Sequence, residues 1–287
     1  MNPIKRRTFV KAGLASSVIG FPSLGQALGA NDRVQVALVG CGGRGTQVTS
    51  SLASRSDVVC TQLCDIHEER LVRTADFIAK QQGGRKPLLA THMEEIFANK
   101  DVDAVVVATP DHWHTPTAIL ACQAGKDVYV EKPFSHNIWE GRKLVEAARK
   151  YKRVVQVGTQ NRSAPYNLAA RDYIQSGKLG DIRLVKVFNL KGGGPFHLGA
   201  PGQAPSGFPW KTWLGPAKAR PYHSKIFHGG WHYFWDYSGG DLADCGIHQL
   251  DLTIMVLGDP ATPKSVSASG GRLQHKGDDG EVPDVEI

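Results

Sequence analysis

The chain has 287 residues, of which 41% are hydrophobic and 21% are charged. That is enough sequence for two globular domains of ordinary composition. The formal net charge is +7, but Lys5, Arg6, Arg7 and Lys11 all lie in the first thirty residues, which hold no acidic residue. Because the rest of the chain is only weakly basic and has no Lys/Arg run, no nucleic-acid partner is expected.

Residues 1–30 have the layout of an export signal. The basic head "KRRTFVK" is followed by a long uncharged stretch rich in Ala, Gly and Ser. The adjacent Arg6 and Arg7 resemble a twin-arginine signal, which predicts a periplasmic or otherwise exported protein with the twin-arginine translocase as a partner. A membrane anchor is the weaker alternative, because Pro22 and the many small residues make a poor spanning helix.

The five cysteines do not indicate a disulfide framework or a metal site. Their number is odd, and Cys60 and Cys64 are expected on one strand and at its end, where they cannot share the tight turn of a metal knuckle. We interpret the cysteines as small residues of the core.

Strands and helices alternate regularly over residues 31–158, which predicts a doubly wound parallel sheet covered by helices on both faces. The apolar runs "RVQVALVG", "DVVCTQLCD", "VDAVVVATP", "DVYV" and "RVVQVG" are the expected strands. Helices are expected over residues 41–54, 67–82, 115–125 and 139–151.

The first strand is followed by a glycine-rich turn with the spacing G-x-G-x-x-G. The candidate residues for contact with a pyrophosphate are Gly40, Gly42, Gly43, Arg44 and Gly45. Asp65 stands at the end of the next strand, where it can accept hydrogen bonds from the hydroxyls of an adenosine ribose. A 2′-phosphate would meet this carboxylate, so NAD is favoured over NADP, although Arg70 leaves dual use open. The alternative is a tight turn without a ligand.

The stretch "ATPDHWHTP" follows the third of these strands. Its polar residues Thr109, Asp111, His112 and His114 crowd the carboxyl edge of the sheet, where ligands of such folds bind. A metal site is the weaker alternative, because one residue separates the two histidines and no third ligand is evident. We therefore expect no metal, and contact of Thr109 and His114 with the nicotinamide half of the cofactor.

The stretch "EKP" ends the next strand at the same edge. Pro133 holds Lys132 in an extended conformation and prevents a helix from starting there. The ammonium of Lys132 is thereby placed over the crevice, where it can bind a substrate oxygen and stabilise negative charge. Glu131 can pair with Lys132 or with a ribose hydroxyl. Taken alone, this tripeptide is equally well explained as a salt bridge on a surface loop.

Residues 159–287 read as a second, substrate-binding domain. A helix is expected over 168–180, strands over 181–190 and 264–274, and a further strand that begins at 285. A long loop rich in Gly and Pro follows residue 190, and tryptophans and tyrosines cluster after it. Aromatic rings there would suit either a carbohydrate pocket or a small aromatic core. The candidate substrate-binding residues are Asn161, Arg162, Trp231 and His232.

The segment 239–258 predicts a helix with two stripes. The apolar stripe consists of Ala243, Ile247, Leu250, Ile254 and Leu257, and the polar stripe of Asp241, Asp244, His248 and Asp251. Asp244 and His248 are four residues apart and so are neighbours on a helix. A carboxylate beside an imidazole orients it and favours its protonated form, which makes His248 a candidate general base.

The four motifs GCGGRG, ATPDHWH, EKP and GGDLADCGIHQLD, in this order, closely resemble those of the Gfo/Idh/MocA oxidoreductases. The resemblance covers about residues 33–273. This family consists of two-domain enzymes similar to glucose–fructose oxidoreductase and inositol dehydrogenase. It implies that Lys132 lies beside the nicotinamide and is catalytic, that the Lys132–Pro133 bond is cis, and that His248 is the base. It also implies a second α+β domain with an open, mostly antiparallel sheet, for which the two or three strands expected here are too few. The sequence therefore reads as incomplete at its C-terminus.

Three functions are consistent with these observations. The first is an NAD-dependent oxidoreductase acting on a sugar or polyol. The second is a redox-assisted glycoside hydrolase. Some relatives work in this way: they oxidise the sugar, eliminate the aglycone, add water and reduce the sugar again, with tightly held NAD. The third is a non-catalytic sugar- or NAD-binding protein, against which the presence of both Lys132 and His248 argues. Family members often pair through their sheets, so a homo-oligomer is an open expectation.

Overall fold

The structure, a computed structural model, describes residues 33–189, 194–260 and 262–286. The predicted export signal at 1–30 lies outside these residues. Within them, no helix has both the length and the apolar character needed to span a membrane.

The N-terminal half is built on a six-stranded parallel sheet with the strand order β3-β2-β1-β4-β5-β6. The strands are β1 (Val34–Val39), β2 (Val58–Cys64), β3 (Leu88–Ala90), β4 (Ala104–Val107), β5 (Asp127–Val130) and β6 (Val155–Val157). All five predicted strands are present. The sequence reading missed β3, which has three residues and two exposed side chains, too few for a periodic pattern.

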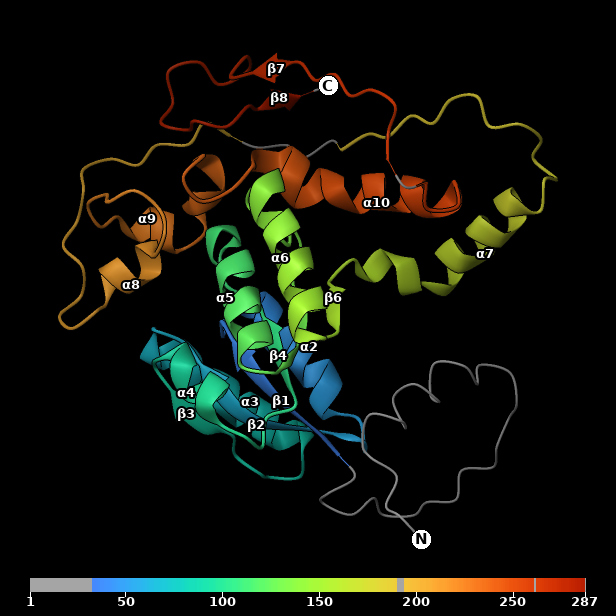
Figure 1. The fold of residues 1–287 in the computed structure, drawn as a ribbon. Coiled ribbons are helices and arrows are strands. Elements are labelled where there is room, and N and C mark those ends of the chain that lie inside the picture. The colour runs from blue at the N-terminus through green and yellow to red at the C-terminus, as the bar shows by residue number, and fades with distance from the viewer. Residues whose placement is uncertain (1–32, 190–193, 261, 287) are drawn as a thin grey trace, which may run out of the picture.

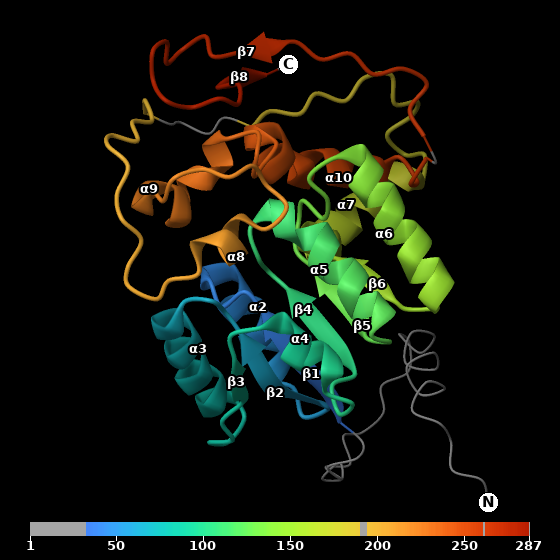
Figure 2. The same ribbon diagram turned by 60° about the vertical axis from the view of Figure 1, so that its left-hand side comes forward.

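Helices cover both faces of this sheet (Figures 1 and 2). They are α2 (Gly43–Ala53), α3 (Glu68–Gln81), α4 (Met93–Ala98), α5 (Asp111–Gln123) and α6 (Ile138–Tyr151). Alternate residues of β1 point to opposite sides: Val36 and Leu38 pack with α2 and α3, while Ala37 and Val39 belong to the core shared with α4, α5 and α6. The doubly wound architecture is thereby confirmed. Cys41, Cys60, Cys64 and Cys122 are buried without disulfides, as expected of core residues.

The C-terminal half combines short helices with irregular chain above the carboxyl edge of the sheet (Figure 2). Its α-helices are α7 (Pro165–Gln175), α8 (Trp210–Leu214), α9 (Ser224–Phe227) and α10 (Ile247–Val256). A π-helical turn, Leu242–Gly246, leads directly into α10. Its core is aromatic, because Trp213, Phe227, Phe234 and Tyr237 are all buried. Of the two interpretations of the aromatic segment, a carbohydrate pocket or a small aromatic core, these four rings therefore support the aromatic core.

The antiparallel sheet of this half is small. It consists of β7 (Gly270–Gly271) and β8 (Val285–Glu286). The predicted strand over 181–190 is wrong for its described residues, since 181–189 have no strand, and the predicted strand over 264–274 shrinks to β7. A strand needs a partner for its backbone N–H and C=O groups, and no backbone hydrogen bond of the described chain involves 181–189.

The expected apolar stripe on the helix over 239–258 is only partly buried. Leu250, Ile254 and Leu257 are each about 45% exposed. Their side chains have the expected helical spacing, but no strand of the described residues covers them. This agrees with the expectation that the predicted strands are too few to cover the helices of this half.

Candidate active site

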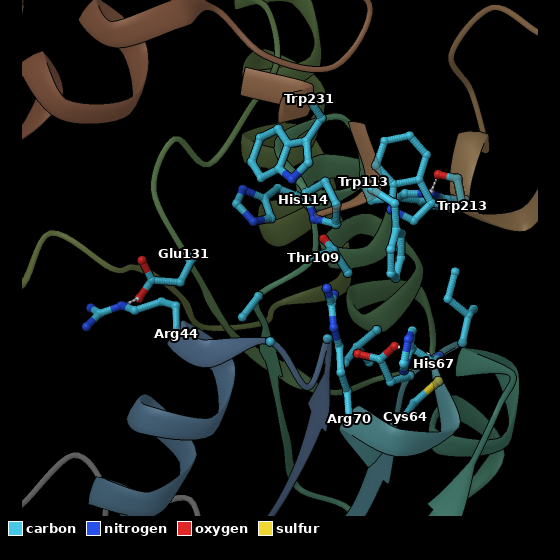
Figure 3. Close-up of a pocket in the computed structure, with 18 of the residues that line it drawn as sticks. Arg44, Cys64, His67, Arg70, Thr109, Trp113, His114, Glu131, Trp213 and Trp231 are labelled. Carbon is cyan, nitrogen blue, oxygen red and sulfur yellow. Dashed lines mark hydrogen bonds and ion pairs between the residues drawn. The ribbon is translucent and has the colours of Figure 1, made fainter. Parts of the chain in front are cut away.

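A cavity of about 950 Å³ lies between the two halves, at the carboxyl ends of the strands. This volume is at the upper end for a ligand pocket. Its floor comes from the turns after β1, β2, β4 and β5, and its roof from α8, α9 and the π-helical turn. Figure 3 shows the labelled side chains of both halves facing one another across it.

The glycine turn after β1 fits a pyrophosphate. Gly40 has φ +99° and lies so close to Ala108 that a Cβ would be 2.4 Å from its carbonyl oxygen. Gly45 packs equally tightly, against the oxygen of Gly40. By contrast, a Cβ on Gly42 or Gly43 would meet nothing within 4 Å, and both residues line the cavity at the start of α2. Two glycines thus fix the turn, and two leave room for phosphate oxygens at a helix N-terminus.

Asp65 lies where the sequence places it, at the end of β2 and in the cavity wall. Its Oδ2 accepts a hydrogen bond from the backbone N–H of Cys41 at 2.6 Å, and its Oδ1 accepts one from the N–H of His67 at 2.8 Å. Burial raises the pKa of its carboxyl above the usual value. Asp65 therefore also connects the glycine turn to the start of α3.

Glu131 pairs with Arg44 and not with the ammonium of Lys132. The Nε of Arg44 donates to Oε1 of Glu131 at 2.8 Å (Figure 3), and the Tyr129 hydroxyl donates to the same oxygen at 3.2 Å. Glu131 is only 3% exposed. The expected ion pair between Glu131 and the ammonium of Lys132 is thus not formed, although the backbone N–H of Lys132 donates to Oε2 of Glu131 at 3.3 Å. Arg44 instead joins the glycine turn to the end of β5.

Lys132 reaches across the cavity to the C-terminal half. Its Nζ donates to the backbone oxygen of Asp244 at 2.9 Å and forms an ion pair with the carboxylate of the same residue. The Lys132–Pro133 bond is cis, as the family resemblance implies. Asp244 lies in the π-helical turn, a type of distortion that is frequent at functional sites. The other carboxylate oxygen of Asp244 is 3.9 Å from Nε2 of His232.

His248 lies on α10 and is not among the residues that line the cavity. Burial, and next the charge of Lys132, lower its pKa, while Asp244 acts in the opposite sense. Its Nδ1 is buried and has no hydrogen-bond partner among the described residues. His248 is therefore neutral at pH 7 and can accept a proton, but its role as the base stays a prediction.

Thr109 and His114 both line the cavity near Lys132. His114 shares a hydrogen bond of 2.7 Å through Nδ1 with the carbonyl oxygen of Pro133, and burial lowers the pKa of its imidazole. The hydroxyl of Thr109 is buried without a partner in the described chain. His112, which has a pKa of about 4 because of burial, bonds to the carbonyl oxygen of Trp213 at 3.0 Å.

The four candidate substrate residues separate into two groups. Trp231 and His232 line the cavity, with their rings stacked at 3.5 Å between centroids. Asn161 and Arg162 do not line it. Arg162 instead forms ion pairs with Asp251 and Asp259 that join the chain before α7 to α10.

One cluster of the described residues has the composition of a metal site. Single ligand atoms of Asp241, Asp244 and Cys245 lie within 4.8 Å of one another. The carboxylate of Asp244 already holds the ammonium of Lys132, which supplies the positive charge that a cation would bring. Neither His112 nor His114 belongs to this cluster.

The sequence places Asp111 at the carboxyl edge of the sheet without assigning it a role, and the structure shows it to be a central residue of the cavity wall. The helix α5 begins at Asp111, four residues earlier than predicted, so its side chain lies in the first turn. It is 3% exposed, lines the cavity, and accepts a hydrogen bond from the Ser238 hydroxyl at 2.7 Å. Burial raises the pKa of its carboxyl to about 8, the charge of Asp244 adds to this effect, and Lys132 opposes it. A buried acid followed by two histidines at a strand end was the available signal.

Asp111→Asn is expected to become progressively more stable relative to the wild type as pH rises from about 4 to about 8. The folded wild type keeps the Asp111 proton up to about pH 8, whereas the unfolded chain releases it near its ordinary pKa, so the wild type loses stability over this window. Asparagine keeps the hydrogen bond from Ser238 and does not titrate. Urea unfolding of both proteins at several pH values measures the difference. A difference that does not change between pH 4 and 8 would contradict the raised pKa.

The fold and site together define a two-part α/β protein with a dinucleotide-type glycine turn and a lysine–carboxylate pair at the same cavity. Two family descriptions match the chain. The oxidoreductase family, NAD-binding Rossmann fold, matches residues 34–159, and the oxidoreductase family, C-terminal alpha/beta domain, matches residues 191–281. The chain belongs to the Gfo/Idh/MocA oxidoreductase family.

A curated relative and two solved structures illustrate this membership. The glycosyl hydrolase family 109 protein of Solibacter usitatus is 29% identical over 180 residues, which cover 60% of this chain and 41% of that protein. GenD2 from gentamicin A biosynthesis, solved with NAD, has a TM-score of 0.64 at 24% identity and covers 93% of this chain and 64% of its own. The WlbA dehydrogenase from Bordetella pertussis, solved with NADH and UDP-GlcNAcA, has a TM-score of 0.63 at 20% identity, over 88% of this chain and 65% of its own.

The match to the curated relative extends over less than half of that protein's length. The two structures share the fold. NAD as the cofactor agrees with the family description and with the geometry of the glycine turn.

Proposed function

We propose that this protein oxidises or reduces a sugar or polyol at a hydroxyl-bearing carbon, with NAD as the hydride carrier. The observation that carries the proposal is the ion pair between Lys132 and Asp244, which the two halves assemble at the edge of the NAD cavity. With the pyrophosphate at the glycine turn and the adenosine at Asp65, the nicotinamide half extends toward the ends of β4 and β5, where Lys132 lies.

The chemistry divides among Lys132 and Asp244, which line the cavity, and His248, which does not line it but whose pKa both of them influence. NAD bound here supplies the acceptor for the hydride of the substrate carbon. Lys132 donates a hydrogen bond to the substrate oxygen, and its charge stabilises the negative charge that develops there. His248, which its lowered pKa keeps neutral, takes the hydroxyl proton. Asp244 holds the ammonium of Lys132 in place and can bind a neighbouring hydroxyl.

A sugar or polyol substrate fits the cavity wall next to this pair. Trp231 offers an aromatic face, and His232 and Asp244 offer polar groups at the same end. Aromatic rings beside hydrogen-bonding groups suit a ring that has apolar faces and polar edges. NAD is favoured over NADP because Asp65 would repel a 2′-phosphate.

The second candidate is redox-neutral glycoside hydrolysis. It uses the same first step, because oxidation of the sugar makes the neighbouring C–H acidic enough for the aglycone to be eliminated. The observation that favours it is that both halves of the chain line the cavity and contact each other across it, which suits a cofactor that is reduced and reoxidised without leaving. The name of the Solibacter usitatus relative, a glycosyl hydrolase family 109 protein, also favours hydrolysis.

One assay separates the two reactions. The purified protein is supplied with NAD and a panel of sugars, polyols and aryl glycosides, and NADH absorbance and aglycone release are followed together. NADH that accumulates with a free sugar supports the dehydrogenase, and aglycone release without net NADH supports the hydrolase. Mass spectrometry of the natively purified protein adds the state of the cofactor. A protein that binds no NAD contradicts both candidates.

We also propose that the protein is exported by the twin-arginine route. Arg6→Lys combined with Arg7→Lys is expected to leave uncleaved precursor in the cytoplasm, because this pathway reads the arginine pair. Cell fractionation followed by immunoblotting measures the distribution, and Lys5→Arg is a matched control that keeps the pair. Normal periplasmic accumulation of the double variant would contradict the proposal.

A further inference from the structure

A contact between the two halves of the chain bridges the cavity beside Asp65, at the expected adenosine end. Phe227, the last residue of α9, is 4% exposed. The ring of His67 stacks on it with 5.4 Å between centroids and 10° between planes. The guanidinium carbon of Arg70 lies 4.5 Å from the centroid of the same ring. We call these three residues, His67, Arg70 and Phe227, the clasp.

The clasp stands at the position of the adenosine ribose. His67 and Arg70 follow Asp65 closely in the chain, and the N–H of His67 donates to Asp65. Figure 3 shows His67 and the extended side chain of Arg70 on this side of the cavity. All three clasp residues line the cavity together with Asp65. The acid that faces the ribose thus comes from one half of the chain, and the opposing aromatic wall from the other.

The nicotinamide end is bridged as well. Lys132 pairs with Asp244, and the Ser238 hydroxyl donates to Asp111. The indole N–H of Trp113 donates to the carbonyl oxygen of Trp213 at 2.9 Å. A dinucleotide in the cavity therefore lies between cross-domain contacts at both of its ends. The adenosine end is the weaker of the two, because it is held by ring packing and by an arginine at the protein surface.

We propose that the clasp retains NAD in the cavity through successive turnovers, with the adenosine half enclosed between Asp65 and α9. The proposal rests on the NAD binding of the proposed function and not on which substrate is used. Release of NAD requires that the ring of Phe227 separate from His67 and Arg70, so these contacts add to the barrier for dissociation. A retained cofactor is what a redox-neutral cycle requires, and a dehydrogenase that exchanges NAD at each turnover gains nothing from it.

The test measures how fast NADH leaves the protein. The protein is loaded with NADH, excess NAD is added as the competitor, and the loss of NADH fluorescence is followed by stopped flow. Arg70→Gln removes the cation above the ring. Phe227→Leu removes the ring but keeps a buried apolar side chain. Each is expected to release NADH roughly tenfold faster than the wild type, the effect of losing one partly desolvated cation–π or ring contact.

Lys80→Gln is the matched control. Lys80 also lies on α3 but is exposed and does not line the cavity, and Phe227 is contacted by Arg70 and not by Lys80 in the described cation–π pairs. Release at the wild-type rate from Lys80→Gln, with faster release from the other two variants, supports the clasp. Equal rates for wild type and Arg70→Gln overturn it, and so does an equal acceleration by Lys80→Gln, which would indicate a general charge effect.

Two further outcomes are decided by the same experiment. A wild type that releases NADH freely, while NAD-dependent turnover is intact, overturns the clasp and leaves the proposed function standing. A wild type that binds no NADH overturns both. Thermal unfolding of Phe227→Leu shows whether this variant is folded, and Arg70→Gln decides the question if it is not.

Discussion

Lys132→Met is expected to lower turnover by about a hundredfold or more, the scale of a positioned acid–base group, while NADH binding stays within about threefold of the wild type. The ammonium of Lys132 is held at the carboxylate and the backbone oxygen of Asp244, where the proposed mechanism places the substrate oxygen. Methionine preserves the length and apolar stem of the side chain but removes its charge. The glycine turn and Asp65, to which the proposal assigns the other half of NAD, do not contact Lys132.

Two comparisons make this result specific. Lys143→Met removes a lysine that pairs with Glu146 on the surface of α6 and should leave turnover unchanged. His248→Asn should lose activity on the same scale as Lys132→Met, and the double variant should be little worse than either single variant, because groups that act as a unit lose their effect together. Steady-state kinetics and NADH titration supply both readouts. Wild-type turnover that survives both substitutions would contradict the mechanism.

The ion pairs at this site are where the sequence was least able to specify the structure. Glu131 and Lys132 are adjacent, and their charges are opposite, so pairing between them was a reasonable expectation. In the structure, Glu131 pairs with Arg44 and Lys132 with Asp244. Both partners are distant in sequence, and only the assembled fold brings them close. Local spacing can therefore identify the charged residues of a site, but not the pairs that they form.

The N-terminal half was predictable because its signals are local and redundant. Each strand is a short apolar run, each long helix has its own apolar face, and the glycine turn lies at the junction of the first strand and helix. In the C-terminal half, the alternation over 181–189 has the same appearance as that of a strand. It does not form one because strand formation depends on a partner, which is a property of other segments and not of the run itself.

The predicted substrate residues also divide into those that the local sequence identifies correctly and those whose position depends on distant partners. Trp231 and His232 lie in the aromatic segment that lines the cavity, and the sequence indicates them by composition alone. Arg162 was equally polar and equally close to the end of the sheet, but Asp251 and Asp259 on the α10 side hold its guanidinium. Its proposed contact with substrate would require these two ion pairs to open. The clasp residues Phe227 and Arg70 had no motif of their own.

Gly45→Ala is expected to be among the most destabilising single-methyl additions in the chain. A Cβ at this position would lie 2.0 Å from the carbonyl oxygen of Gly40 and 3.1 Å from side-chain atoms of Ala108 and Leu38. The oxygen of Gly40 has little freedom to retreat, because Gly40 itself, at φ +99°, is pressed against the backbone of Ala108. Overpacking of this kind costs about 1–3 kcal/mol or more, and the turn that receives the pyrophosphate would be displaced with it.

Gly43→Ala is the control that isolates this cause. It adds the same methyl group two residues away in the same helix, where a Cβ meets nothing within 4 Å. Its free energy of unfolding should stay within about 0.5 kcal/mol of the wild type, as for other substitutions that create no clash. Urea unfolding measures both variants, and NADH titration shows whether the turn still binds. Equal stability of the two variants would contradict this cause: the close approach of α2 to the end of β1 would then not require a glycine at position 45.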